Sequence, residues 1–160
     1  MPTRSKTAGQ SVATPTDRRA GTQVTIQKLI AERTEMLSLY WRLAGLSPDG
    51  SEPHHTRRQM QKELQQFCQV LVDYIAAGHF SLYERIASGT ERRQQVADLA
   101  VKLYSRIAET TQHALDFNDK YDDGDHCDIT DAFSRDLSRL GEELTARIEL
   151  EDQVIAAMTR

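Results

Sequence analysis

The sequence lacks long apolar runs, holds only two cysteines and has no proline after residue 53. Its longest apolar runs span three or four residues, such as Val70-Leu71-Val72, whereas a membrane-spanning helix needs roughly 18. Cys68 and Cys127 lack the spacing of a redox or metal-binding pair, and the first residues lack the apolar segment of a signal peptide. We therefore expect a cytoplasmic protein with free thiols and no membrane association.

Strand-forming residues are also scarce. Leu and Ala number 15 and 16, whereas Val and Ile number only 7 and 8, a balance that favours helices over a β-sandwich or barrel. All four prolines lie within the first 53 positions, so long uninterrupted helices can form in the rest of the chain. With 160 residues, the chain is long enough for one domain with a single core.

The short motifs that mark catalytic and phosphate-binding sites are missing as well. The sequence contains no Gly-x-Gly-x-x-Gly, Gly-x-x-x-x-Gly-Lys or Gly-x-Ser-x-Gly motif, so it offers neither a phosphate-binding loop nor a nucleophile elbow. We therefore expect no enzymatic activity and no cofactor.

Metal binding is the alternative that a helical protein of this size raises. A di-metal bundle requires Glu-x-x-His on two helices, but this sequence has only Glu109 and His113, four residues apart, with no second copy. The acidic segment from Asp119 to Thr130 has the spacing of an EF-hand, yet Tyr121 stands where an acid or amide is needed and Thr130 where a bidentate Glu is needed. We expect no metal, and keep a metal- or ligand-binding four-helix-bundle sensor as the alternative function.

The charges are distributed unevenly along the chain. The formal net charge is −4, but residues 1–22 carry +3 and the remainder −7, and residues 109–152 alone carry −10. An acidic body repels the phosphates of nucleic acids and attracts basic protein surfaces. The charge therefore argues against direct nucleic-acid binding, although solubility alone would also explain it.

Apolar residues recur at three- and four-residue steps in four long stretches, the pattern of amphipathic helices. Residues 1–22 lack this periodicity, so we expect a disordered tail there and a helical domain over residues 23–160. The predicted fold is an all-α antiparallel four-helix bundle with a short extra helix after the second long one. The expected bounds are Thr25 to Gly45, Thr56 to Gly78, a short helix capped by Ser81 and broken at Gly89, Thr90 to Asn118, and Asp128 or Thr130 to Met158.

Two residues interrupt the pattern of the last predicted helix. Gly141 lies inside it at a cost of about 1 kcal/mol relative to Ala, which predicts the close approach of a neighbouring helix. Glu151 lies in the apolar stripe, where an unpaired carboxylate costs several kcal/mol. Arg147, four residues earlier, is its nearest candidate partner, and Asp152, about 100° further round, should face solvent. A helix end open to solvent and a partner contact are the alternatives for Glu151.

The segment from Tyr74 to Arg85 gathers two tyrosines, a phenylalanine, a histidine and charged residues around a helix break. Such a cluster is typical of core packing across a tight corner. It is equally typical of a protein-binding hot spot with aromatic anchors and a polar rim. The residue pattern alone does not choose between them.

Several blocks of the sequence resemble one known family. Residues 67–86, FCQVLVDYIAAGHFSLYERI, resemble the signature of the regulator-of-sigma-D (Rsd/AlgQ) family, and residues 147–155, RIELEDQVI, resemble its C-terminal motif. Residues 115–125 are similar to the pseudomonad AlgQ branch, and residues 29–37 are a looser match to the first helix. Leu29 stands where the family has Trp and Ile148 where it has Phe, each an apolar residue replacing another.

This resemblance implies a cytoplasmic bacterial anti-sigma factor that regulates transcription. Members of the family bind the primary sigma factor of RNA polymerase, chiefly its region 4. They thereby limit access of sigma to core RNA polymerase and to the −35 element. The resemblance implies no catalytic residues and no cofactor, and for some members a second protein partner, a sugar-phosphotransferase phosphocarrier.

The family motif also implies where the partner binds. Phe80 would be the apolar anchor of a small interface, and Asp73 and Glu84 would pair with basic side chains of the partner. Arg147, Glu151 and Asp152 would have a structural or secondary role. The complete partner-binding set implied by the motif is Asp73, His79, Phe80, Ser81, Tyr83 and Glu84.

Overall fold

Four long helices and one short helical turn make up the described part of the protein. The computed structural model describes residues 15–45, 57–83, 93–122 and 131–159. The long helices are α1 (Pro15–Leu43), α2 (Arg57–Gly78), α4 (Gln94–Tyr121) and α5 (Asp131–Met158), and α2 continues into the π-helical turn η1 (His79–Tyr83). These ranges contain no strand, so the prediction of an all-α four-helix bundle is confirmed. The turn η1 follows the second long helix, but most of the segment in which the short extra helix was expected, up to Gly89, lies outside the described residues.

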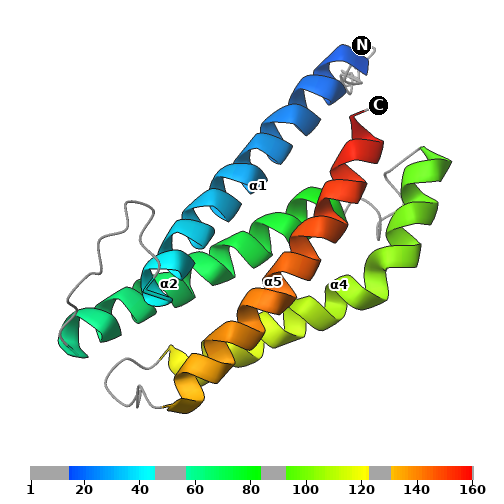
Figure 1. Ribbon diagram of the computed structural model, residues 1–160. Helices are drawn as coiled ribbons and strands as arrows, with labels where there is room; N and C mark the ends of the chain where they lie inside the picture. Colours follow the sequence, from blue (N-terminus) through cyan, green and yellow to red (C-terminus); the bar gives the residue numbers. More distant parts are fainter. Residues whose placement is uncertain (1–14, 46–56, 84–92, 123–130, 160) are drawn as a thin grey trace, which may run out of the picture.

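Consecutive long helices run in opposite directions (Figure 1). α1 packs against α2, α4 packs against α5, and α2 also contacts α4, while η1 contacts both α1 and α2. The N-terminal end of α1 and the C-terminal end of α5 therefore lie at the same end of the bundle as η1 and the start of α4 (Figure 1).

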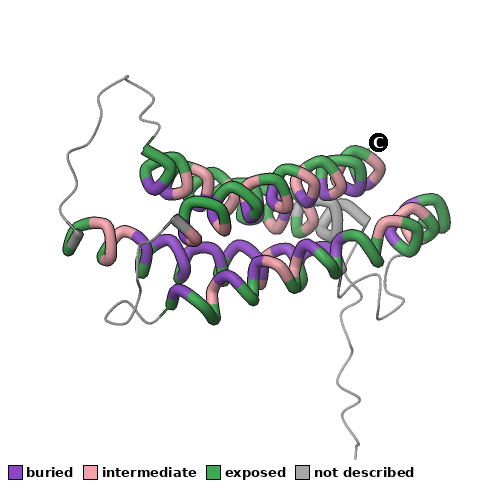
Figure 2. The backbone as a smooth tube through the Cα atoms, turned by 60° about the horizontal axis from the view of Figure 1, so that its bottom comes forward, coloured by how far each residue is buried: buried purple, intermediate pink, exposed green. Residues whose placement is uncertain are grey.

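The core follows the apolar stripes that the periodicity predicts. Leu64, Phe67, Leu71 and Tyr74 of α2 are fully buried at three- and four-residue steps, and Figure 2 shows the buried positions on the inward faces of the helices. Burying one such side chain contributes about 1.5–3 kcal/mol, so these stripes drive the assembly. The buried apolar residues of α4 and α5 are Val96, Ala100, Ile107, Ala114, Phe117, Tyr121, Phe133, Leu137, Leu140, Leu144, Val154 and Met158.

The first helix begins earlier than the sequence predicts. α1 starts at Pro15 rather than near Thr25, so residues 15–22 of the expected disordered tail are helical, and residues 1–14 lie outside the described part. Proline is well suited to the first turn of a helix because its missing N–H is not needed there. The Thr25 hydroxyl donates to the Gly21 carbonyl across 2.7 Å, within one continuous helix. The apolar stripe starts only at Ile26, which is why periodicity misses the extension.

Two glycines have the predicted roles. Gly45 follows α1 with φ 75°, a left-handed conformation that glycine adopts readily at the end of a helix. Gly141 of α5 lies against Tyr40 of α1: a Cβ at Gly141 would come within 2.2 Å of the Tyr40 hydroxyl oxygen. That hydroxyl donates to the Leu137 carbonyl across 2.9 Å. The predicted close approach of a neighbouring helix at Gly141 is therefore confirmed.

The other expected boundaries agree in part. α2 ends at Gly78 as predicted, but Ser81 lies inside η1 instead of capping a separate helix, because α2 passes into η1 without an intervening turn. α4 begins at Gln94, after the expected cap at Thr90. The positions Thr56, Gly89, Thr90, Cys127, Asp128 and Thr130 lie outside the described residues.

Candidate protein-binding site

The junction at which α2 passes into η1, called the corner below, lies at Gly78. This residue is buried, and a Cβ there would lie 3.1 Å from the Nη2 atom of Arg147 and 3.2 Å from Oε1 of Glu151. The backbone of α2 therefore ends directly against a polar pair of α5. The single turn that follows is a π-helix, a conformation often found at functional sites.

The η1 turn divides into an exposed and a buried half. Phe80 is 64% exposed, and the ring of His79, also exposed, meets it edge-on at 5.2 Å between centroids. Ser81 and Leu82 are buried, with exposed fractions of 5% and 0%, and so fix the turn to the bundle. The turn thus holds a large aromatic ring in solvent on a firmly packed support.

Three residues of the predicted partner-binding set are exposed on α2 and on the turn that follows it. Asp73 is exposed on α2, and His79 and Phe80 are exposed on η1. Ser81 is buried, so it serves packing rather than the surface patch in which the sequence placed it. Tyr83 closes η1, but its side chain lies outside the described residues, as does all of Glu84.

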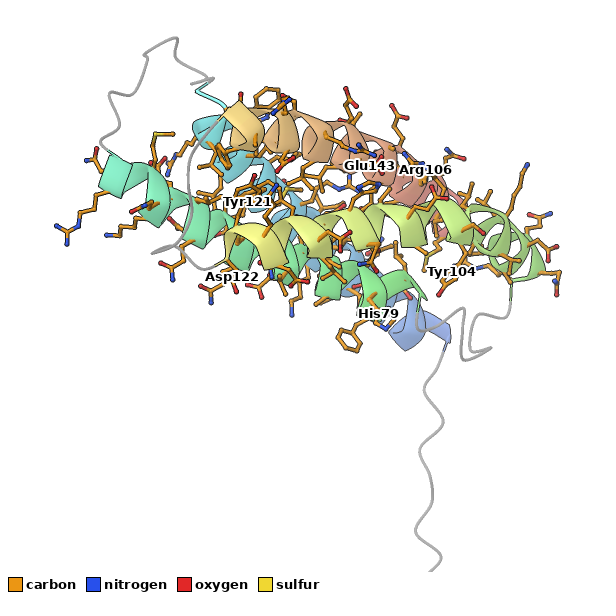
Figure 3. All side chains as sticks on the ribbon, turned by 90° about the horizontal axis from the view of Figure 1, so that it is seen from below. His79, Tyr104, Arg106, Tyr121, Asp122 and Glu143 are labelled. Atoms are coloured by element: carbon orange, nitrogen blue, oxygen red, sulfur yellow. The ribbon has the colours of Figure 1, made fainter. Side chains whose placement is uncertain are left out.

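An apolar groove beside the corner was not predicted from the sequence. The groove, about 360 Å³ in volume, runs between α2 with η1 on one side and α4 on the other, and Val72, Phe80, Tyr104 and Leu115 line it. Tyr104 is 57% exposed, and Figure 3 shows it on the same side of the molecule as His79. The available signal was an exposed tyrosine of α4 outside the apolar stripe of that helix.

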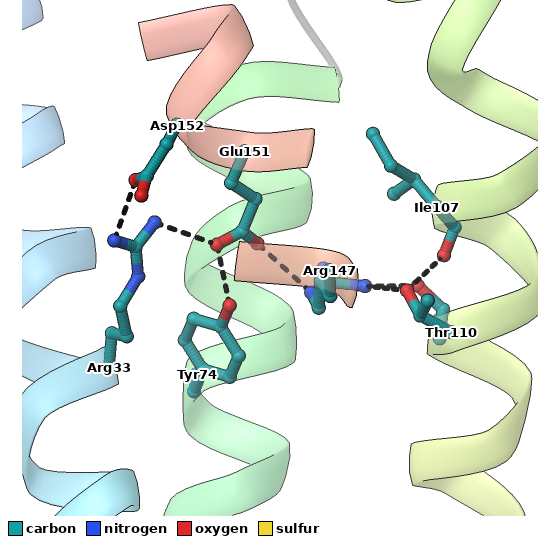
Figure 4. A network of polar contacts seen from close by, with 8 residues as sticks. Arg33, Tyr74, Ile107, Thr110, Arg147, Glu151 and Asp152 are labelled. Carbon is teal, nitrogen blue, oxygen red and sulfur yellow. Dashed lines mark hydrogen bonds and ion pairs between the residues drawn. The ribbon is translucent and has the colours of Figure 1, made fainter. Parts of the chain in front are cut away.

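Beneath the corner lies a buried network centred on Glu151 (Figure 4). Arg147 and Glu151 are 1% and 0% exposed, and the Nε of Arg147 donates to Oε1 of Glu151 across 2.9 Å. The Tyr74 hydroxyl and the Nη2 of Arg33 both donate to Oε2, across 2.5 and 3.1 Å. Both oxygens of this buried carboxylate are therefore compensated.

The network joins all four long helices. Arg33 comes from α1, Tyr74 from α2, and Arg147 and Glu151 from α5. On the α4 side, the Nη1 of Arg147 donates to the hydroxyls of Thr111 and Thr110 across 2.6 and 3.3 Å. The Thr110 hydroxyl in turn donates to the Ile107 carbonyl across 2.7 Å.

The electrostatics fix the role of each group in the network. Burial, the negative charge of Glu151 and the hydrogen bond to it raise the pKa of Tyr74, so its phenol keeps its proton and donates. Desolvation lowers the pKa of Arg33, but the hydrogen bond to Asp152 and the charge of Glu151 outweigh it and the net pKa is raised. The Arg147 guanidinium also lies over the Tyr74 ring, 5.6 Å from its centroid.

The predicted facing of the two acids is confirmed. Glu151 is completely buried and pairs with Arg147, whereas the side chain of Asp152 is 58% exposed and binds Arg33 at 2.8 Å. The contributions of Arg33, Tyr74 and Thr110 were missed. Each interrupts an otherwise apolar helix face, as Glu151 does, and that shared feature was the signal available in the sequence.

A second polar arrangement joins the ends of α4 and α5. The Nζ of Lys120 and the hydroxyl of Tyr121 donate to Oδ2 of Asp136, across 2.7 and 2.5 Å. These two hydrogen bonds, that of Lys120 first, lower the pKa of Asp136. Further along the same helix pair, the Nη1 of Arg106 donates to Glu143 across 2.9 Å (Figure 3).

Neither a metal centre nor a membrane span emerges from the described ranges. In residues 15–45, 57–83, 93–122 and 131–159, no group of three His, Cys, Asp or Glu side chains could hold a metal ion. Among the same residues, no helix combines the length and the apolar character needed to cross a membrane.

These features define a class: a four-helix bundle that presents an exposed aromatic corner above a buried ion pair, an arrangement suited to binding another protein. The chain belongs to the family described as regulator of RNA polymerase sigma(70) subunit, Rsd/AlgQ, whose model matches residues 10–159.

Curated relatives agree with this family. The chain is 37% identical over 142 residues to proteins named regulator of sigma D from Shigella boydii serotype 4, Shigella dysenteriae serotype 1 and Escherichia coli K12. Each of these matches covers 88% of this chain and 87% of the relative. No solved structure is a significant match.

Proposed function

We propose that this protein is an anti-sigma factor that binds region 4 of the primary sigma factor and limits its access to core RNA polymerase and to the −35 element. The family and the relatives named regulator of sigma D support this proposal. We assign binding to the helical domain, which begins with α1 at Pro15 instead of residue 23. We expect the protein to act in the cytoplasm by binding alone, without catalysis.

The observation that carries the proposal is the exposure of Phe80. A phenylalanine that is 64% exposed on a turn whose other half is buried is available as an anchor. Aromatic anchors supply much of the energy of protein interfaces because they bury a large area and lose little conformational freedom. Phe80 should therefore enter an apolar pocket of region 4.

Charge complementarity favours binding through the DNA-reading surface of region 4. Region 4 carries the helix-turn-helix that reads the −35 element, and a surface that reads DNA is basic. The exposed Asp73 on α2 fits such a surface, and the acidic body of the protein attracts it at longer range. A partner held by its DNA-reading face is unable to reach the promoter at the same time.

Calorimetry of the full chain with isolated region 4 tests the proposal. Phe80→Ala should weaken binding by about 2 kcal/mol or more, roughly 30-fold in Kd. Trp41→Ala is the matched control, because Trp41 is 45% exposed on α1, away from η1, and its loss should leave the affinity unchanged. Wild-type protein that does not bind region 4, or a folded Phe80→Ala protein that binds normally, would refute the proposed site.

Asp73→Asn tests the electrostatic part. The variant should reduce the association rate and the dependence of that rate on salt, with a smaller effect on dissociation. Glu35→Gln, at an exposed position of α1, is the control for the loss of one negative charge elsewhere. Equal effects of the two variants would mean that only net charge matters.

A further inference from the structure

An apolar groove lies beside Phe80, between α2 with η1 on one side and α4 on the other. Four of its lining residues are large apolar side chains with substantial exposure: Val72 at 37%, Phe80 at 64%, Tyr104 at 57% and Leu115 at 36%. Contiguous exposed apolar surface of this kind marks interaction sites in soluble proteins. Because Phe80 belongs both to the corner and to the groove, the two form one continuous surface.

The shape of the groove suits a helix. Its α4 wall is formed by Tyr104, Ala108, Thr111 and Leu115, which follow one another at three- and four-residue steps along a single face. From Tyr104 to Leu115 this wall extends about 16 Å at the rise of an α-helix, the length of about three helical turns. Amphipathic helices bind in apolar grooves through side chains at the same spacing.

The charges around the groove favour a basic helix. Asp73 follows Val72 directly, and Asp119 lies one turn after Leu115 on the same face of α4; both acids are exposed. Among the described residues that line the groove, Arg147 is the one Lys or Arg; it is 1% exposed and paired with Glu151, so it repels a basic partner little. The occupant that fits is a helix with apolar residues along one side and Lys or Arg at its edges.

We propose that a helix of sigma region 4 binds in the groove between α2 and α4, with Tyr104 as a second anchor beside Phe80. This inference rests on the proposed function and extends the sigma-binding surface from the corner onto α4. A helix-turn-helix domain supplies such a helix, because the helices of this domain are amphipathic and carry the basic residues that contact DNA phosphates.

Two variants test the groove without touching the corner. Tyr104→Ala removes the anchor and should weaken binding to region 4 at least tenfold, and Ala108→Trp fills the groove and should weaken it more strongly still. Ala108 and Ala156 are both exposed helical positions, so Ala156→Trp on α5 is the control for added bulk. Trp41→Ala is the control for a lost exposed aromatic, and both controls should stay within twofold of wild type.

A footprint provides a measurement that does not depend on affinity. Saturating region 4 should slow alkylation of the thiol in the Ala108→Cys variant at least tenfold, measured on the peptide by mass spectrometry. Alkylation of the Ala156→Cys variant should continue at its free rate. Protection of both positions, or of neither, would contradict binding in the groove.

The outcomes separate this inference from the proposed function. If Phe80→Ala weakens binding while Tyr104→Ala and Ala108→Trp bind as wild type, the groove is not used and the proposed function stands. If wild-type protein does not bind region 4, both fall. If sedimentation shows a dimer of this protein that Ala108→Trp dissociates, the occupant is a second copy and the inference is overturned.

Discussion

The Tyr74 hydroxyl donates to Oε2 of Glu151 across 2.5 Å, and neither residue has any exposed surface. One helix thus supplies a neutral donor to a carboxylate of another helix, in a place that water does not reach. Because Arg147 and Arg33 bind the same carboxylate, its charge is balanced by two guanidinium groups from α5 and α1.

Removing the central carboxylate should therefore be costly. Glu151→Ala leaves Arg147 buried without its ion-pair partner, which typically destabilises a protein by about 3–5 kcal/mol. Asp152→Ala removes an exposed partner of Arg33 and should cost about 1 kcal/mol or less. Chemical denaturation of both variants measures the difference. Equal losses, or a larger loss for Asp152→Ala, would contradict the facing seen here.

The Tyr74 hydroxyl can be tested without disturbing the packing of its ring. Tyr74→Phe loses a hydrogen bond to a charged group, and the free energy of unfolding should fall by about 1.5–3 kcal/mol. Tyr40→Phe is the matched control, since the Tyr40 hydroxyl donates to the neutral carbonyl of Leu137, and its loss should cost about 0.5–1.5 kcal/mol. A smaller loss for Tyr74→Phe than for Tyr40→Phe would argue against the charged partner.

The same tyrosine should make stability sensitive to alkali. The pKa of Tyr74 is raised in the folded state above its ordinary value of 10.0. Above that pH the unfolded chain releases the proton while the folded protein retains it, so stability falls as pH rises. Wild type should lose more stability above that pH than Tyr74→Phe does. Parallel curves for the two proteins would contradict the raised pKa.

Asp136 should have the opposite dependence, at the acid end. Its pKa is lowered from the ordinary 3.8 by the hydrogen bonds from Lys120 and Tyr121. The stabilisation is therefore present above this value and is lost as pH falls through the lowered pKa of the folded state. The stability difference between wild type and Asp136→Asn should shrink on acidification. A difference that is constant from neutral pH to below the pKa of the folded state would show that the charge plays no part.

Gly141 offers a test in which the sign of the effect changes. An alanine in an exposed helix is better than glycine by about 1 kcal/mol, but here its Cβ would collide with the Tyr40 hydroxyl at 2.2 Å. Gly141→Ala should destabilise wild type and stabilise a Tyr40→Ala background. A double-mutant cycle measures this coupling. The same effect in both backgrounds would contradict the contact.

The sequence predicted those features whose signal lies within a single helix. The apolar stripes predicted which face each helix buries, and the position of Glu151 within its stripe predicted both its burial and its pairing with Arg147, four residues away. The glycine at position 141, inside the last predicted helix, likewise predicted a close neighbour. In each case a local pattern contained the whole signal.

What the sequence could not predict depends on how the helices meet. Arg33 and Glu151 are separated by 118 residues in the sequence, and they come into contact only when the helices pack together. Tyr104 was missed because it lies beside the stripe of α4, where a tyrosine resembles any other exposed residue until η1 is placed next to it. The start of α1 at Pro15 could not be predicted, because the first residues of this helix show no apolar periodicity.

The polar contacts between the first and last helices have a consequence for the order in which the helices assemble during folding. Arg33 and Tyr40 of α1 find their partners at Glu151, Asp152 and the Leu137 carbonyl of α5, across 97 to 119 residues of chain. During synthesis, α1 and α2 can pair as soon as they leave the ribosome, but these contacts must wait until α5 has been made. We therefore expect the closure of the bundle between α1 and α5 to be a late event in folding, with Arg33 hydrated until α5 has been made.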